Sequence, residues 1–212
     1  MPRSSPFVLP EDAGFIECFN QKAKPAHKIR VELLPEPYLG DPLAPVVLLS
    51  LNPGFSDADL GIHQNPVFAA RSMDNLFHHP NKYPFFLLNP ELNTAPGNGW
   101  WNRKLSELIE EAGLETVASR LLCVEFFPYH SRQYRKCKNT LPSQLYSFDL
   151  VRKAMRRGAV IIMMRSSRLW LEAIPELNKY KVHCVNSVQN PKISAKNCPD
   201  GYRCASTAIF NA

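Results

Sequence analysis

Four short, mainly apolar runs constrain what this chain can fold into. They cover residues 46–51, 121–127, 159–164 and 181–185, and each gives way abruptly to polar or turn-forming residues. A short, continuous apolar run is typical of a strand that is buried on both faces of a parallel sheet. The sequence therefore predicts four parallel strands whose carboxyl ends deliver loops to one edge of a sheet, where ligands of such sheets bind.

Segments with helical periodicity separate these strands. Apolar residues recur three and four positions apart in 105–112 and 145–155, and shorter helices are predicted for 11–19 and 167–173. A last segment, 194–210, can close the domain as a helix, although Pro199 and Gly201 interrupt it. Alternating strands and helices predict an α/β fold of three layers, α/β/α, with a central four-stranded parallel sheet.

The length of 212 residues suits one domain with a sizeable core. We assign residues 46–212 to this domain and residues 1–45 to an N-terminal extension packed on it, because four prolines punctuate 35–45 as a loop. No apolar run approaches the roughly 18 residues of a membrane-spanning helix, and the N-terminus lacks the apolar segment of a secretory signal. We expect a monomeric cytoplasmic protein without a membrane partner.

Basic residues are concentrated in one part of the chain. The formal net charge is +6, yet residues 131–158 alone carry eight basic residues against one acidic residue, Asp149. The eight are Arg132, Arg135, Lys136, Lys138, Arg152, Lys153, Arg156 and Arg157. Such a stretch is either a solvated face or a surface for a polyanion such as DNA.

The cysteines and the candidate metal ligands predict no cofactor. The six cysteines, at positions 18, 123, 137, 184, 198 and 204, contain no C-x-x-C pair, so we expect reduced thiols rather than the alternative, an iron–sulfur cluster. Asp57, Asp59 and His63 could be drawn as a metal site, but closely spaced carboxylates are common on loops and only one histidine joins them. We expect no metal.

Two polar segments follow the first and the fourth predicted strands. The first reads Ser50-Leu51-Asn52-Pro53-Gly54, and the second reads Asn190-Pro191-Lys192-Ile193-Ser194. The pair resembles the two signature motifs of the uracil-DNA glycosylase superfamily, G-[IM]-N-P-G and [HN]-P-S-x-L-S, as its mismatch-specific and single-strand-selective branches carry them. Ser50 stands where the family has glycine, and the second segment is one residue shorter, with Lys192 in place of the Ser-x pair. The resemblance covers residues 46–194.

The resemblance implies a monofunctional DNA glycosylase, which hydrolyses the bond between a base and its sugar. Cleavage passes through an oxocarbenium-like sugar, so a positioned water suffices as nucleophile, and an amide can orient that water through its carbonyl. The resemblance gives this role to Asn52. It implies that Asn190 donates to the departing base, and that Lys192 and Ser194 contact the DNA. Asn52-Pro53-Gly54 could also be an ordinary strand-terminating turn, a reading that the second segment makes less favoured.

Other side chains complete the predicted site. Phe55 and Phe68 are candidates for the platform on which a flipped base stacks, although either could be a core residue. His130 follows the second strand and could contact a base, contact a phosphate or be a loop histidine. Three basic residues of the 131–158 stretch are predicted to bind phosphates, namely Arg132, Arg135 and Lys136.

Glu125 lies near the carboxyl end of the second predicted strand and bears on which base is read. An ionised carboxylate only accepts hydrogen bonds, so it would favour an exocyclic amine, as on cytosine or adenine. A protonated Glu125 could instead donate to a carbonyl, if burial raised its pKa. The third possibility is a structural ion pair with an arginine such as Arg165.

Two further functions remain open at this stage. A non-catalytic nucleic-acid-binding protein could keep the fold and lose the chemistry, since both motifs depart from the family pattern. A nucleoside hydrolase or nucleotide-binding enzyme is less favoured, because the chain lacks a glycine-rich phosphate loop and a small substrate needs no strongly basic surface.

Overall fold

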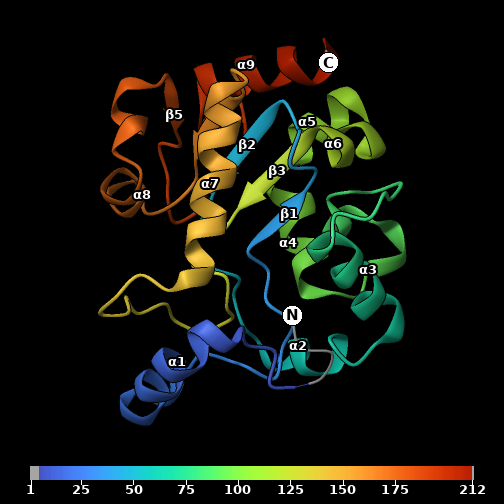
Figure 1. Cartoon of the computed structure of the whole chain (residues 1–212). Helices are drawn as coiled ribbons and strands as arrows, with labels where there is room; N and C mark the ends of the chain where they lie inside the picture. Colours follow the sequence, from blue (N-terminus) through green and yellow to red (C-terminus); the bar gives the residue numbers. More distant parts are fainter. Residues whose placement is uncertain (1–4, 212) are drawn as a thin grey trace.

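One five-stranded mixed sheet forms the centre of the molecule (Figure 1). The computed structural model describes residues 5–211. The strand order is β1-β3-β2-β4-β5, in which β1 is antiparallel to β3 and all other pairs are parallel. The strands are β1 (Tyr38–Gly40), β2 (Val46–Leu49), β3 (Leu121–Val124), β4 (Val160–Met163) and β5 (Val182–Cys184).

Helices connect these strands and pack on both faces of the sheet. The α-helices within residues 5–211 are α1 (Pro10–Lys22), α2 (Asp57–Ile62), α3 (Pro66–Leu76), α4 (Pro96–Lys104), α5 (Ser106–Ala112), α6 (Leu114–Arg120), α7 (Pro142–Arg156), α8 (Ser167–Ala173) and α9 (Pro199–Phe210). Short 3-10 turns are η1 (Pro25–His27), η2 (Phe86–Leu88), η3 (Pro90–Leu92) and η4 (Pro175–Lys179). None of the helices in this part of the chain is long and apolar enough to cross a bilayer.

The expectation of a sheet with only four parallel strands was wrong, although the four predicted strands are β2 to β5. The fifth strand, β1, lies in the proline-punctuated segment that we expected to be a loop, and only three residues pair with β3. Gly40 closes this pairing with a φ of 108°, and a Cβ there would clash with the Leu121 carbonyl oxygen. A strand this short, flanked by prolines, leaves no periodic signal.

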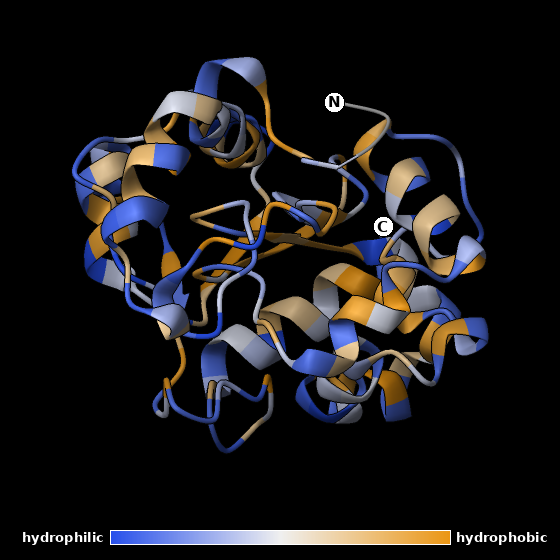
Figure 2. Ribbon diagram, turned by 90° about the horizontal axis from the view of Figure 1, so that it is seen from below, coloured by the Kyte–Doolittle hydropathy of each residue, from blue (hydrophilic) through white to orange (hydrophobic). Residues whose placement is uncertain are grey.

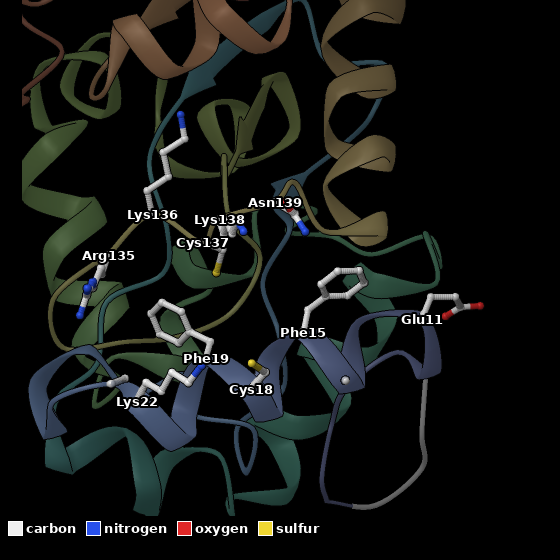
Figure 3. Close-up of a pocket in the computed structure, with 12 residues that line it drawn as sticks. Glu11, Phe15, Cys18, Phe19, Lys22, Arg135, Lys136, Cys137, Lys138 and Asn139 are labelled. Atoms are coloured by element: carbon white, nitrogen blue, oxygen red, sulfur yellow. The ribbon is translucent and has the colours of Figure 1, made fainter.

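The segment before β1 also packs on the rest of the molecule. Helix α1 contacts α7, and buried Asp12 of α1 accepts a hydrogen bond from the Tyr129 hydroxyl at 2.6 Å. Phe15 and Phe19 of the same helix extend towards residues 135–139 (Figure 3). Helix α9 begins at Pro199, because a proline needs no hydrogen-bond partner in a first turn. The proline that interrupted the predicted helix is therefore its first residue.

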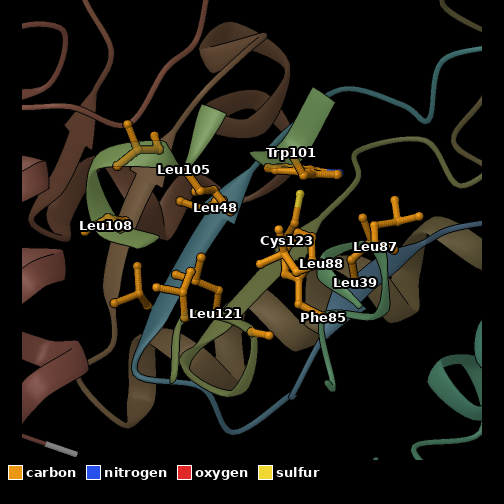
Figure 4. Close-up of a cluster of buried hydrophobic side chains, with 14 of the residues drawn as sticks. Leu39, Leu48, Phe85, Leu87, Leu88, Trp101, Leu105, Leu108, Leu121 and Cys123 are labelled. Carbon is orange, nitrogen blue, oxygen red and sulfur yellow. The ribbon is translucent and has the colours of Figure 1, made fainter. Parts of the chain in front are cut away.

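Alternate residues of the central strand β2 enter two separate cores. Val46 and Leu48 pack with residues of α4, α5, α6 and α9 (Figure 4). Val47 and Leu49 pack with α7 and α8 on the opposite face. All four side chains are completely buried, and each contributes on the order of 2 kcal/mol by leaving water. The central strands are accordingly hydrophobic in Figure 2, whereas hydrophilic colour is concentrated on the surrounding helices and loops.

Trp170 of α8 joins the second core to the loop after β2. Its side chain is fully buried, and its indole N–H donates to the Ser50 carbonyl oxygen at 2.7 Å. We expect Trp170→Phe to lower the free energy of unfolding by about 2–4 kcal/mol, because it opens a cavity and leaves that carbonyl unpaired. Phe210→Leu, at a side chain that is 58% exposed, is the control and should change little. Equal urea midpoints for Trp170→Phe and the wild type would contradict this role.

Candidate active site

A cavity of about 400 Å³ opens where the parallel strands end. The loops after β2, β3 and β4 line it, together with the start of α4. Six of the side chains expected to act together line this cavity: Asn52, Phe55, Phe68, Glu125, His130 and Arg132. Its place at the carboxyl ends of parallel strands and the polar side chains in its lining make this cavity the candidate active site.

The amide of Asn52 is fixed by its nitrogen. Its Nδ2 donates to the Pro53 carbonyl oxygen at 2.8 Å and to the Ser131 hydroxyl at 3.1 Å. A carbonyl only accepts, so the amide nitrogen must face Pro53. The Oδ1 atom has no hydrogen-bond partner among residues 5–211. Asn52 can therefore present a carbonyl oxygen to a water or a ligand in the cavity.

Glu125 is a buried carboxyl group in the wall of the cavity. It is 4% exposed, and its Oε2 has no partner within the described chain. Burial raises the pKa of Glu125 to about 8, although the nearby Ser50 hydroxyl and Arg165 guanidinium oppose the rise. No ion pair within 4.0 Å joins Glu125 to Arg165 in the described structure. The carboxyl group is therefore mostly neutral at pH 7, and its Oε2 is a buried polar atom in the cavity wall whose hydrogen-bonding capacity is unused by residues 5–211.

A second buried carboxyl group, Glu36, lines the same cavity. Burial raises the pKa of Glu36 to about 7; His130 opposes the rise, whereas Glu125 and Asp59 add to it. The two ring nitrogens of His130 face backbone carbonyl oxygens, Gly54 at 2.7 Å and Leu34 at 3.0 Å. Because carbonyls only accept, both contacts are hydrogen bonds only when the ring is a doubly protonated cation. The charge that such a ring carries favours the ionised form of Glu36.

Glu36, His63 and His130 lie close enough to be considered as metal ligands, with their ligand atoms within 4.8 Å of one another. The hydrogen bonds oppose this use. Both nitrogens of His130 are engaged by carbonyls, and the Nδ1 of His63 accepts from the Leu34 N–H at 3.2 Å. Burial, followed by the charge of His130, lowers the pKa of His63 to about 3, so its ring is neutral with the proton on Nε2. Neither histidine presents a lone pair to a metal.

The alternative metal site is not assembled either. Asp57 pairs with Arg132 at 2.7 Å, and Asp59 accepts from the Ser56 N–H at the start of α2. His63 accepts a hydrogen bond from the Leu34 N–H, so each of the three side chains contacts a different partner. Of the cysteines, Cys123 and Cys198 are buried and the other four are exposed or half-buried; all six are free thiols.

Aromatic rings and cations surround the mouth of the cavity. The guanidinium groups of Arg30 and Arg132 lie 4.2 Å and 5.5 Å from the ring centre of Phe55, which is half-buried. The Trp100 ring has Lys104 at 5.3 Å and Arg165 at 5.8 Å. Each cation–ring contact adds roughly 0.5–1 kcal/mol. Phe68 is 3% exposed and packs edge-on against Phe86, so it is both a core residue and part of the wall.

The second motif does not line the cavity but lies beside it. Asn190 is exposed, and its Oδ1 accepts from Lys104, whose ammonium also lies over the Trp100 ring. Asn197 shapes the loop by donating to the Asn190 and Lys192 carbonyls at 3.2 Å and 2.9 Å.

Two predicted DNA contacts of this motif are engaged within the protein. Lys192 pairs with Glu107 at 2.9 Å, and Ser194, 3% exposed, accepts from the Asn197 N–H. Burial removes Ser194 from the surface that a phosphate could reach in this conformation.

The basic stretch does not form one unopposed face. Five of its eight side chains pair with acidic groups, two of them with Asp149 and the others with Asp57, Glu172 and Glu176. Arg135 and Lys136 line a different hollow, beside α1. The sequence reasoning missed Glu36 and Asn197. An acidic residue between two prolines, Pro35-Glu36-Pro37, was a usable signal for Glu36, whereas nothing local marks Asn197.

Comparison with models of protein families, with curated proteins and with solved structures gives no match for this chain.

The raised pKa of Glu125 predicts how the stability of the folded protein depends on pH. A carboxyl that ionises near pH 4.5 when unfolded and near pH 8 when folded costs stability progressively as the pH rises between these values. Glu125→Gln removes this cost, which amounts to a few kcal/mol. Thermal unfolding from pH 5 to pH 9 should therefore show a melting temperature that falls less steeply for the variant.

Glu172→Gln is the control for this experiment. Arg168 and Lys136 lower the pKa of Glu172, so this carboxyl is ionised in both the folded and the unfolded chain above pH 5, and its replacement should leave the pH dependence between pH 5 and pH 9 unchanged. The melting temperatures of Glu125→Gln and the wild type could instead change in parallel over the whole pH range. That result would show that the folded protein does not hold Glu125 neutral.

Proposed function

We propose that this protein is a monofunctional DNA glycosylase with a glycosylase-like, three-layer arrangement around its sheet. The observation that carries the proposal is the fixed amide of Asn52, whose unpartnered carbonyl oxygen borders a cavity at the carboxyl end of β2. That amide can hold a water for attack on an oxocarbenium-like sugar, a reaction that needs position more than base strength. The bond between the base and C1′ breaks and its electron pair leaves with the base; the water oxygen bonds to C1′, and the proton that this water loses is taken up by solvent while the departing base is protonated from solvent.

The lining of the cavity also bears on which base it would bind. A neutral Glu125 offers a hydroxyl donor and a carbonyl acceptor, which together match the adjacent carbonyl and ring N–H of a uracil-type base. The same group can match the ring nitrogen and amino group of a cytosine-type base. An ionised Glu125 would match the amino group alone. Burial of Glu125 therefore supports a uracil-type base at neutral pH as well as a cytosine-type base.

The contacts of the second motif favour a second candidate, a nucleic-acid-binding protein without catalysis. Asn190 is engaged by Lys104, and Lys192 by Glu107, so the loop that would assist the departing base is held by the protein itself. A panel of oligonucleotides that contain uracil, hypoxanthine, mismatched thymine or modified cytosine, each treated with alkali after incubation, separates the two candidates. Base release supports the glycosylase, and binding without release from any substrate supports the second candidate.

Asn52→Ala should abolish most base release but preserve DNA binding. Losing an oriented water should lower the single-turnover rate by on the order of 100-fold or more. Asn178→Ala, which removes an exposed asparagine of η4, is the matched control and should keep the wild-type rate. A folded Asn52→Ala protein with near-normal turnover would reject the assignment of Asn52 as the water-positioning residue.

The release of a uracil-type base should fall as the pH rises through about 8, because ionised Glu125 can no longer donate to a base carbonyl. Glu125→Gln keeps one donor and one acceptor but cannot ionise, so its activity should persist above pH 8. Glu36→Gln, at the other buried carboxyl of the cavity, should keep the alkaline fall. If Glu125→Gln loses activity equally at every pH and on every base, then Glu125 supports the structure rather than reading the base.

A further inference from the structure

We infer that a groove between α1 and residues 135–139 binds a single strand of nucleic acid through stacked bases and neutralised phosphates. This groove is separate from the candidate active site and has a volume of about 700 Å³. The inference rests on the proposed function in one respect, namely that the strand is the one whose base enters the active-site cavity.

The floor of the groove carries two phenyl rings. Phe15 is 45% exposed, which is unusual for so large an apolar side chain on a helix that packs against the core through its other face. Phe19, one turn further along α1, is half-buried. Figure 3 shows both rings rising from α1 towards the segment that carries Arg135 to Asn139. Exposed rings in a groove are the platform on which unpaired bases stack.

The walls of the groove carry the charge that a phosphate chain requires. Lys22, Arg135, Lys136 and Lys138 line it, and Glu11 is the acidic residue among the described residues that line it. Lys136 pairs with Glu172 at 3.3 Å, a contact between exposed groups that costs little to exchange. Arg135 and Lys138 have no ion pair among residues 5–211. Cations beside aromatic rings fit a polyanion with apolar bases, and this charge complementarity selects a nucleic-acid strand.

The groove is connected to the active-site cavity through the chain itself. Arg132 and Tyr134 line the cavity, and the next residue, Arg135, lines the groove. The segment 132–138 therefore borders both hollows. A strand whose target base occupies the cavity can continue along this segment into the groove. A duplex cannot use the groove in this way, because its bases are already stacked and paired.

Fluorescence anisotropy with the full-length protein tests this inference. The probes are a labelled single-stranded oligonucleotide of mixed normal bases and the duplex of the same sequence, neither with a target base. Phe15→Ala should weaken binding of the single strand by about tenfold, because each stacked base contributes roughly that much. Lys138→Glu should also lower the slope of log affinity against log salt by about 0.7 for a lost phosphate contact.

Two matched variants serve as controls. Phe210→Ala removes a similarly exposed phenyl ring of α9, and Lys179→Glu reverses an exposed lysine of η4; both should bind as the wild type does. A Phe15→Ala protein with unchanged affinity for the single strand overturns the inference. So does an equal loss of affinity for the duplex, which would mean that the groove takes a partner without stacked bases, or reads charge alone.

The same variants separate this inference from the proposed function. Loss of single-strand binding in Phe15→Ala, in a protein that releases no base from any substrate, supports the groove and rejects the glycosylase. The opposite outcome is that Phe15→Ala and Lys138→Glu leave base release from single-stranded substrates unchanged at substrate concentrations below KM. That result rejects the groove as a strand-binding site and is compatible with the proposed glycosylase.

Discussion

The parallel pairing of β2 with β3 and β4 is the constraint on which the rest of the structure depends. Leu49, the last residue of β2, is paired with Val124 of β3 and with Met163 of β4. The three strands therefore end at the same edge of the sheet, and a loop follows each of them directly. The side chains that follow, including Asn52, Glu125 and Arg165, meet around one cavity although more than 110 residues separate the first from the last.

The same arrangement sets the chemistry of the cavity. Strands buried on both faces leave little water near their ends, so a carboxyl group placed there is desolvated and its pKa rises. Glu125 and Glu36 are both in this position. Ser50, which stands where the motif that the sequence resembles has glycine, lies in the same wall and opposes the rise of the Glu125 pKa. Ser50 and the buried carboxyl of Glu125 are thus neighbours in space, and replacing Ser50 should change the pKa of Glu125.

Loops supply the groups that the strands cannot. Asn197 and Lys104 hold the loop of the second motif beside the cavity by hydrogen bonds to its carbonyls and to Asn190. His130 ties the loop after β3 to the Gly54 and Leu34 carbonyls. Asn197 and His130 lie in irregular segments and Lys104 is the last residue of α4, and neither periodicity nor a turn signal indicates which partner such a polar side chain will find.

The sequence by itself determined the four parallel strands, the helices α1, α5, α7 and α8, and the presence of Asn52 and Glu125 at strand ends, because periodicity and burial act over a few neighbouring residues. Only the tertiary structure decided that β1 joins the sheet, that Glu36 and Glu125 line the same cavity, and that the basic stretch divides between acidic partners and a groove beside α1. These features depend on contacts between segments distant in the chain. Such contacts are fixed by the packing of the whole molecule and leave no pattern in either segment alone.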